Sequence, residues 1–147
     1  MQDIKPKRGR TGGEKTRCSG AWTEARFKSF VKGNLRRCSM KWAPIGQCLK
    51  EARTKRGFYH CAGCEQEVPS SVKVEGSRRR VKNVHVDHIE AIIDPAVGWT
   101  NWDDCINRMF SELDNLQVLC GSCHTIKTNE EKAIAKARRA KEKLNDE

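Results

Sequence analysis

The chain has 147 residues, of which 29 are Lys or Arg and 19 are Asp or Glu, so its formal net charge is +10. That length suits one domain with a tail or a small appended module. The positive charge indicates a polyanionic partner, nucleic acid first and an anionic membrane surface second. No stretch approaches the roughly 18 consecutive apolar residues of a transmembrane helix, which argues against a membrane protein.

The charge is unevenly distributed. Residues 1–58 carry 16 Lys and Arg against 4 Asp and Glu, whereas residues 59–128 carry 7 against 10 and residues 129–147 carry 6 against 5. All four His and five of the eight Cys lie in the slightly acidic middle block. We therefore expect the N-terminal third to bind a polyanion and the middle block to carry the chemistry.

The first elements are basic. Residues 1–20 are rich in Lys, Arg and Gly and lack an apolar core, which predicts a flexible basic tail and no secretory signal. Residues 21–58 are expected to form a basic helical DNA-binding region. Thr23 is the predicted cap of its first helix, whose apolar stripe consists of Phe27, Phe30, Val31, Leu35 and Cys38.

A second helix is predicted over residues 43–56. Pro44 suits its first turn, and Gly57 is expected to end it. Cys48 falls on its apolar stripe, and we expect Cys48, like Cys38 on the first helix, to be a small core residue and not a metal ligand.

The middle block alternates between strand and helix signals. Two β-rich runs, residues 72–75 and 81–88, predict a hairpin. A short helix is expected from about residue 101 to 111, followed by a strand over residues 116–119. Residue 121 is expected to open a helix that continues into a charged C-terminal extension, residues 129–147.

Two CxxC pairs, Cys61–Cys64 and Cys120–Cys123, are separated by residues 65–119. Two such pairs together are typical of a closed Cys₄ zinc site, and a redox role for either pair is the main alternative. With no secretory signal, we expect a reducing, cytoplasmic location, where cysteines are thiols or metal ligands and not disulfides.

The sequence VHVDHI over residues 84–89 places a carboxylate and two imidazoles at the end of a strand. A hard divalent ion favours a carboxylate and accepts an imidazole, and a neutral His can take a proton from water. Asp87 and His124 are therefore candidates to converge on a second ion. In a regular strand Asp87 and His88 point to opposite faces, so the strand must end, twist or bulge there.

His88, Asn115 and His124, within CAGC, VDHI and DNLQVLCGSCHTIKT, resemble the defining residues of the HNH endonucleases, in the subgroup flanked by zinc knuckles. GWTNWDDCINRMFSELDNLQVLC is similar to the small HNH nucleases encoded by tailed phages, so a phage protein acting in the cytoplasm of a bacterial host is expected. The resemblance covers residues 61–128. It implies a small α+β fold: a ββα-metal core over residues 59–128, stabilised by zinc, with N-terminal helices and a C-terminal helical extension.

The resemblance also implies roles. His88 would be the general base that activates water, and Asp87 and His124 would hold one divalent ion, Mg²⁺ or Mn²⁺, at the phosphate and the 3′-oxygen leaving group. Asn115 would brace the loop, and the products would carry 5′-phosphate and 3′-hydroxyl ends. The structural zinc ligands would be Cys61, Cys64, Cys120 and Cys123.

Contacts to double-stranded DNA are expected from six further side chains: Arg78, Arg79, Arg80, Lys127, Arg108 and His85. Alternatives remain open for five of them: a solvated turn for the arginine triplet, a carboxylate partner for Arg108, and for His85 either orientation of the metal ligands or a surface position. The alternative function is a zinc-stabilised nucleic-acid-binding protein without catalysis.

Overall fold

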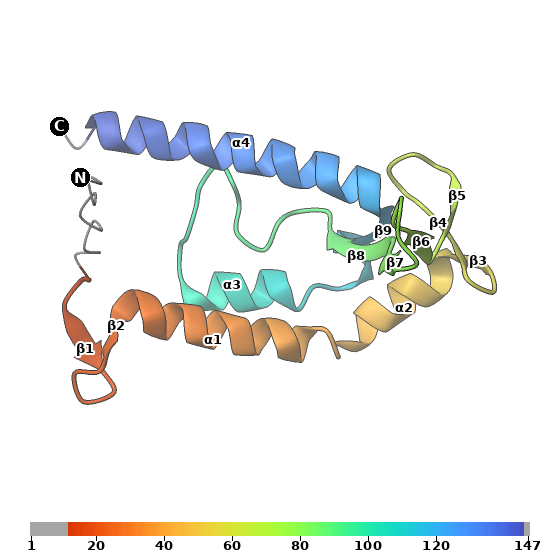
Figure 1. Cartoon of the computed structure of the whole chain (residues 1–147). Helices are drawn as coiled ribbons and strands as arrows, with labels where there is room; N and C mark the ends of the chain where they lie inside the picture. Colours follow the sequence, from red (N-terminus) through yellow and green to blue (C-terminus); the bar gives the residue numbers. More distant parts are fainter. Residues whose placement is uncertain (1–11, 146–147) are drawn as a thin grey trace, which may run out of the picture. The chain divides into compact units, whose positions relative to one another are not determined.

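The computed structural model describes residues 12–145 (Figure 1). The chain divides between Arg37 and Cys38 into two compact units, each of which is described by itself. Among the helices described, none combines the length and the apolar character that crossing a bilayer requires.

The first unit is a short hairpin followed by a helix. Strands β1 (Lys15–Arg17) and β2 (Trp22–Thr23) pair antiparallel, and α1 (Glu24–Ser39) follows at once. The hydroxyl of Thr23 accepts a hydrogen bond from the backbone N–H of Arg26 at 3.2 Å, which confirms the predicted cap.

Two expectations for this region need correction. Residues 15–17 of the predicted tail form β1, and Arg17 pairs with Glu24 at 2.8 Å; residues 1–11 lie outside the described residues. Cys38, near the end of α1, is exposed and not a core residue, whereas Cys48 is buried as expected.

The second unit begins with α2 (Ala43–Ala52), which has Pro44 in its first turn as predicted. The helix ends before the expected Gly57, because the chain turns extended at Arg53 and enters a small antiparallel sheet. That sheet consists of β3 (Arg53–Lys55), β4 (Phe58–His60) and β5 (Glu67–Pro69). Gly57, with a φ of +79°, serves the tight turn between β3 and β4.

The hairpin predicted over residues 72–88 exists only in part. Strands β6 (Ser71–Lys73) and β7 (Arg80–Lys82) pair with each other. Residues 84–88 form a separate strand, β8 (Val84–His88), which pairs antiparallel with the distant β9 (Leu116–Cys120). The register runs from Val84 opposite Cys120 to His88 opposite Leu116.

Asn83 separates β7 from β8. Its side-chain N–H donates to the carbonyl of Pro69 at 2.9 Å, and its side-chain oxygen accepts from the N–H of Gly121 at 3.2 Å. The backbone of Asn83 makes the change of partner, because its N–H donates to the carbonyl of Ser70 at 2.9 Å and its carbonyl accepts from the N–H of Gly121 at 2.9 Å.

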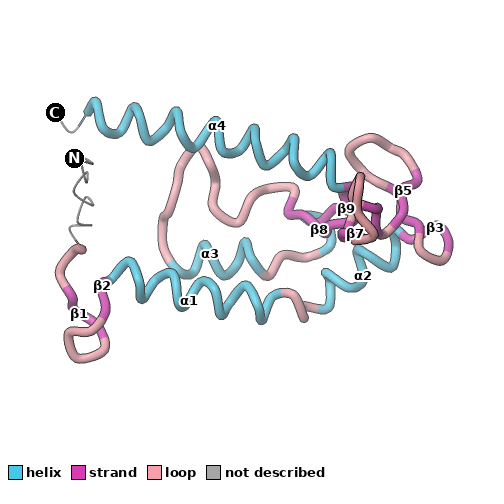
Figure 2. Tube along the Cα trace, in the orientation of Figure 1, coloured by secondary structure: helices cyan, strands magenta, loops and turns pink. Residues whose placement is uncertain are grey.

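Three helical segments complete this unit. Helix α3 (Trp102–Met109) is capped by Asn101, whose side chain accepts from the N–H of Asp104 at 2.8 Å. A 3₁₀ turn, η1 (Leu113–Asn115), leads into β9, and α4 (Gly121–Asn145) follows β9 without a loop. Figure 2 shows this succession: β9 pairs with β8 and leads directly into the long helix α4.

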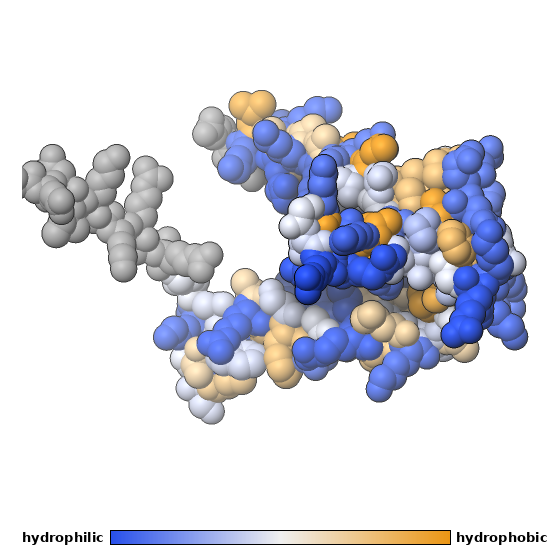
Figure 3. Space-filling model, turned by 45° about the vertical axis from the view of Figure 1, so that its right-hand side comes forward, coloured by the Kyte–Doolittle hydropathy of each residue, from blue (hydrophilic) through white to orange (hydrophobic). Residues whose placement is uncertain are grey.

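The core of this unit lies where α2 covers the β8–β9 pair. Val84, Leu116 and Val118 are buried there together with Cys48, and Ile45 and Leu49 of α2 pack against them. On the face drawn in Figure 3, hydrophobic residues are scattered among hydrophilic ones. The apolar burial that fixes β8 against β9 therefore also fixes the polar residues at the end of β8.

Candidate metal centre and neighbouring polar site

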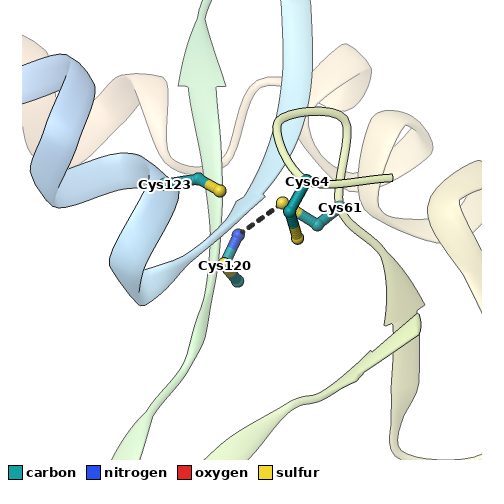
Figure 4. A group of neighbouring side chains, drawn as sticks. All are labelled: Cys61, Cys64, Cys120 and Cys123. Carbon is teal, nitrogen blue, oxygen red and sulfur yellow. Dashed lines mark hydrogen bonds between the residues drawn. The ribbon is translucent and has the colours of Figure 1, made fainter. Parts of the chain in front are cut away.

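The sulfur atoms of Cys61, Cys64, Cys120 and Cys123 all lie within 4.8 Å of one another. Figure 4 shows the four side chains gathered between the turn that follows β4 and the start of α4. Two sulfurs on one zinc ion at about 2.3 Å are separated by at most about 4.6 Å, so small adjustments suffice. The cysteine cluster can hold a metal ion such as zinc, and the expected convergence of the two CxxC pairs is confirmed.

Backbone hydrogen bonds build the cluster. In the first knuckle the N–H of Glu65 donates to the carbonyl of Cys61 at 2.8 Å, and the N–H of Ala62 donates to the carbonyl of Val118 in β9 at 2.8 Å. The N–H of Cys120 donates to the sulfur of Cys61 at 3.2 Å (Figure 4). The first knuckle is thus held directly on the strand that carries the second.

The sulfur environment favours one thiolate. Burial on its own would raise the pKa of Cys61, but N–H groups of Cys120, Cys64 and Gly63 lower it to about 6. Hydrogen bonding to Cys120, together with burial, raises the pKa of Cys123 to about 12. A divalent cation among the sulfurs would favour the thiolate at every position.

A second polar group lies at the end of β8. The Asp87 carboxylate is 15% exposed, and its Oδ1 lies 3.9 Å from Nε2 of His124 on α4. Its other oxygen, Oδ2, accepts a hydrogen bond from Gln117 on β9 at 3.1 Å. The sequence-predicted pair, Asp87 and His124, is therefore brought together by β8 and α4.

Lys127 also contacts this carboxylate. Its Nζ lies 2.8 Å from Oδ2 of Asp87 and 2.9 Å from Glu131, and it donates to the carbonyl of His88 at 2.6 Å. Burial would lower the pKa of Lys127, but the bonds to Asp87 and Glu131 raise it. An ammonium has three N–H donors, and three partners use them here, whereas the sequence suggested a phosphate contact.

His88 points away from Asp87, toward α3. Its Nε2 lies 3.0 Å from the carbonyl oxygen of Met109, the last residue of α3. A carbonyl can only accept, so Nε2 carries the proton and, in the neutral ring, Nδ1 is an acceptor. β8 ends at His88, and its pairing with β9 is regular up to that residue, with Asp87 opposite Gln117 and His88 opposite Leu116.

Asn115 joins the segments that flank β8 and β9. Its side-chain oxygen accepts from the N–H of Glu90 at 2.8 Å, and its amide donates to Ser111 at 3.1 Å and to the carbonyl of Glu90 at 3.3 Å. The backbone carbonyl of Asn115 accepts from Ile89 at 2.9 Å. Asn115 therefore fixes the chain directly after His88.

His85 lies on the Asp87 face of β8. Its ring stacks on that of His124, with ring centroids 4.8 Å apart and an interplanar angle of 21°. Burial, with the neighbouring His124 and Lys82, lowers the pKa of His85 and favours its neutral form. The stack restrains the ring of His124 opposite Asp87.

The arginines differ in their surroundings. Arg78 and Arg79 are exposed at the β6–β7 turn, whereas Arg80 donates to the hydroxyl and the carbonyl of Ser71 at 3.0 and 2.8 Å. Arg108 donates to Asp104 at 3.3 Å and to the carbonyl of Ala91 at 3.0 Å. Arg80 is also exposed, but its guanidinium is engaged by Ser71.

Sequence reasoning missed four contributors to these sites: Asn83, Gln117, Glu131 and the carbonyl of Met109. A backbone carbonyl has no residue-type signal at all. Glu131 has one, because it lies four residues after Lys127 on a helix, a spacing typical of ion pairs.

We found no match to this chain among protein-family models, curated proteins or solved structures. The chemistry of the two sites therefore rests on their own residues.

Proposed function

We propose that this protein is a metal-dependent endonuclease of the HNH type that hydrolyses phosphodiester bonds in DNA. The observation that carries the proposal is the 3.9 Å approach of the Asp87 carboxylate to the ring nitrogen of His124, with Asp87 directly preceding His88 in β8. Two antiparallel strands, β8 and β9, followed at once by α4, support a ββα-metal core.

The donor set fits a divalent ion. An octahedral Mg²⁺ with metal–ligand distances of about 2.0–2.1 Å separates adjacent ligand atoms by about 3.0 Å and opposite ones by about 4.2 Å. The separation of Asp87 Oδ1 and His124 Nε2 lies between these values, so a small side-chain movement would bring both atoms onto one ion. When bound, such an ion supplies charge stabilisation at the phosphate and the 3′-oxygen leaving group.

His88 is the proposed general base. Its Nε2–H is fixed by the carbonyl of Met109, so Nδ1 is the atom that accepts a proton from water. Asn115 fixes the backbone on the C-terminal side of His88, and Lys127 binds its carbonyl. Attack of that water on phosphorus with departure of the 3′-oxygen gives 5′-phosphate and 3′-hydroxyl ends.

The cysteine cluster is the proposed structural zinc site. Its four sulfurs come from two segments far apart in sequence, which favours a shared metal over two separate redox pairs. The cluster lies at the junction of β9 and α4, so zinc there would fix α4, which carries His124, relative to the strand pair that carries Asp87.

DNA is the proposed substrate because the chain carries a net charge of +10 and exposed arginines at the β6–β7 turn. Such a charge gives salt-dependent attraction to the phosphate backbone.

The test is cleavage of supercoiled plasmid by the zinc-loaded protein with Mg²⁺ or Mn²⁺. We expect nicked or linear products from the wild type, and no cleavage but retained DNA binding from His88→Ala. His60→Ala, which removes an exposed imidazole of β4, is the matched control. A folded, zinc-loaded wild type that binds DNA and never cuts it would instead support the non-catalytic alternative.

A further inference from the structure

Lys127 occupies one side of the Asp87 carboxylate. Its ammonium lies 2.8 Å from Oδ2, while Oδ1, on the other side, is the oxygen that faces His124. The two side chains are largely shielded from water, with 23% and 15% exposed. Charges in such surroundings interact more strongly than on an open surface.

We propose that Lys127 is a resident counter-ion of Asp87 that weakens divalent-ion binding to the free protein and makes ion loading depend on the phosphate of bound DNA. This inference rests on the proposed function, because it assigns Asp87 and His124 to the divalent ion. Lys127 acts through Asp87 and is a positioning residue, not a catalytic one.

The charge balance supports a weak site in the free protein. An ion that touches Oδ1 shares one carboxylate with the Lys127 ammonium, so the two cations repel each other across it. Glu131, 2.9 Å from Nζ, holds the ammonium in this place and offsets part of its charge. The ion therefore meets less than the full attraction of Asp87.

Orientation of Asp87 does not depend on Lys127 alone. Gln117 donates to the same oxygen, Oδ2, at 3.1 Å, and β8 is held along its whole length by β9. Removing the charge of Lys127 should therefore leave the carboxylate in place and strengthen its attraction for a divalent ion. The gain in ion affinity from removing the positive charge is expected to exceed the loss in ion affinity from removing one restraint on the Asp87 side chain.

A phosphodiester brings the missing negative charge. With DNA bound, a phosphate oxygen beside the ion offsets the repulsion from Lys127, so ion affinity rises. Because binding linkage is reciprocal, the ion then strengthens DNA binding by the same factor. Ion loading and substrate binding are coupled in this way.

The test is Mn²⁺ titration by calorimetry of the full-length, zinc-loaded protein without DNA. We expect Lys127→Met and Lys127→Gln to bind Mn²⁺ about tenfold more tightly than the wild type, because both remove the charge. Lys127→Gln keeps an N–H donor, so it decides the question if Lys127→Met fails to fold. Lys127→Arg and the exposed-site control Lys132→Met should stay close to the wild type.

The coupling is measured with uncut DNA in a His88→Ala background. We expect DNA to raise Mn²⁺ affinity less in His88→Ala/Lys127→Gln than in His88→Ala alone. Lys127→Gln binding Mn²⁺ no more tightly than the wild type would overturn the inference. So would an unchanged Mn²⁺ affinity with weakened DNA binding, which would mark Lys127 as a phosphate contact.

Failure of the proposed function gives a different result. If Asp87→Asn abolishes Mn²⁺ binding and Lys127→Gln tightens it, while no variant cuts plasmid, the counter-ion role stands and the nuclease proposal falls. If the wild type cuts plasmid and Lys127→Gln binds Mn²⁺ no more tightly, the nuclease proposal stands and the counter-ion role falls.

Discussion

Gly63 lies so close to Cys123 that a Cβ atom on Gly63 would be 2.8 Å from the Cβ and 2.9 Å from the sulfur of Cys123. Leu119 lies 3.3 Å from the same position. We therefore expect Gly63→Ala to push the two knuckles apart, lowering both zinc content and the free energy of unfolding, the latter by about 1–3 kcal/mol. Metal analysis and thermal denaturation measure the two effects.

Gly46→Ala is the matched control for that substitution. Gly46 lies inside α2, and nothing lies within 4 Å of an added Cβ. Alanine is favoured over glycine in a helix interior by about 1 kcal/mol, so this variant should be as stable as the wild type or more stable. Full zinc content and unchanged stability in Gly63→Ala would mean that the close approach is easily relieved.

Local signals predicted much of the helical structure. The cap at Thr23, the short helix expected from about residue 101 and the helix that opens at Gly121 depend on neighbours within a few residues, and the structure has all three. The predicted end of α2 was wrong, because pairing with β4 makes the chain extended from Arg53, before Gly57 is reached. Tertiary pairing overrode a local stop signal there.

Strand pairing was the weaker part of the prediction. Residues 81–88 carry one continuous β-rich pattern, yet it divides at Asn83, whose backbone N–H bonds to Ser70 and whose carbonyl bonds to Gly121. The partner of β8 is β9, and a run of alternating residues does not encode which distant strand completes it.

The sequence identified site residues whose role requires a particular side chain. It missed residues whose role depends on their position in the fold. Asp87 and His124 stood out because carboxylate and imidazole are metal ligands, and the structure brings them together. The carbonyl of Met109, which fixes the ring of His88, could come from any residue. Gln117 and Glu131 act through Asp87 and Lys127, so their roles depend on strand register and helix phase.

Loss of one cysteine from the cluster should remove the metal. We expect Cys64→Ser to lower zinc content well below that of the wild type and to destabilise the fold by more than about 4 kcal/mol, because metal binding is coupled to folding. A strong chelator should lower the melting temperature of the wild type and leave that of Cys64→Ser unchanged. Cys38→Ser, at an exposed cysteine outside the cluster, is the control. Equal zinc content in Cys64→Ser and the wild type would contradict a four-cysteine site.

Replacing Asn115 should lower the rate of cleavage more than it lowers the stability of the protein. Asn115→Ala removes its side-chain bonds to Glu90 and Ser111, which we expect to destabilise the protein by about 1–3 kcal/mol. Because the chain after His88 then loosens, we expect maximal cleavage at saturating ion to fall by up to about 10²-fold. Single-turnover cleavage measures this, with Asn107→Ala, at an exposed asparagine of α3, as the control. A wild-type rate in folded Asn115→Ala would show that its bracing of the loop has no bearing on the chemistry.

The β6–β7 turn should carry part of the salt-dependent DNA affinity. Arg78 and Arg79 are exposed there, while Arg80 is bound to Ser71 and is expected to contribute less. Each phosphate contact adds about one to the slope of log affinity against log salt concentration. We expect Arg78→Ala/Arg79→Ala to weaken DNA binding at low salt and to reduce that slope by about two. Fluorescence anisotropy with labelled duplex at several salt concentrations measures it.

The control for charge alone is Lys141→Ala/Lys143→Ala, which removes the same number of positive charges from exposed positions near the end of α4. A local contact at the turn lowers the slope only in the arginine variant. An equal reduction in both double variants would mean that DNA responds to the net charge of the chain, and the β6–β7 turn would then have no contact of its own. Because neither pair touches Asp87 or His124, cleavage at saturating DNA and ion should stay at the wild-type rate in both variants.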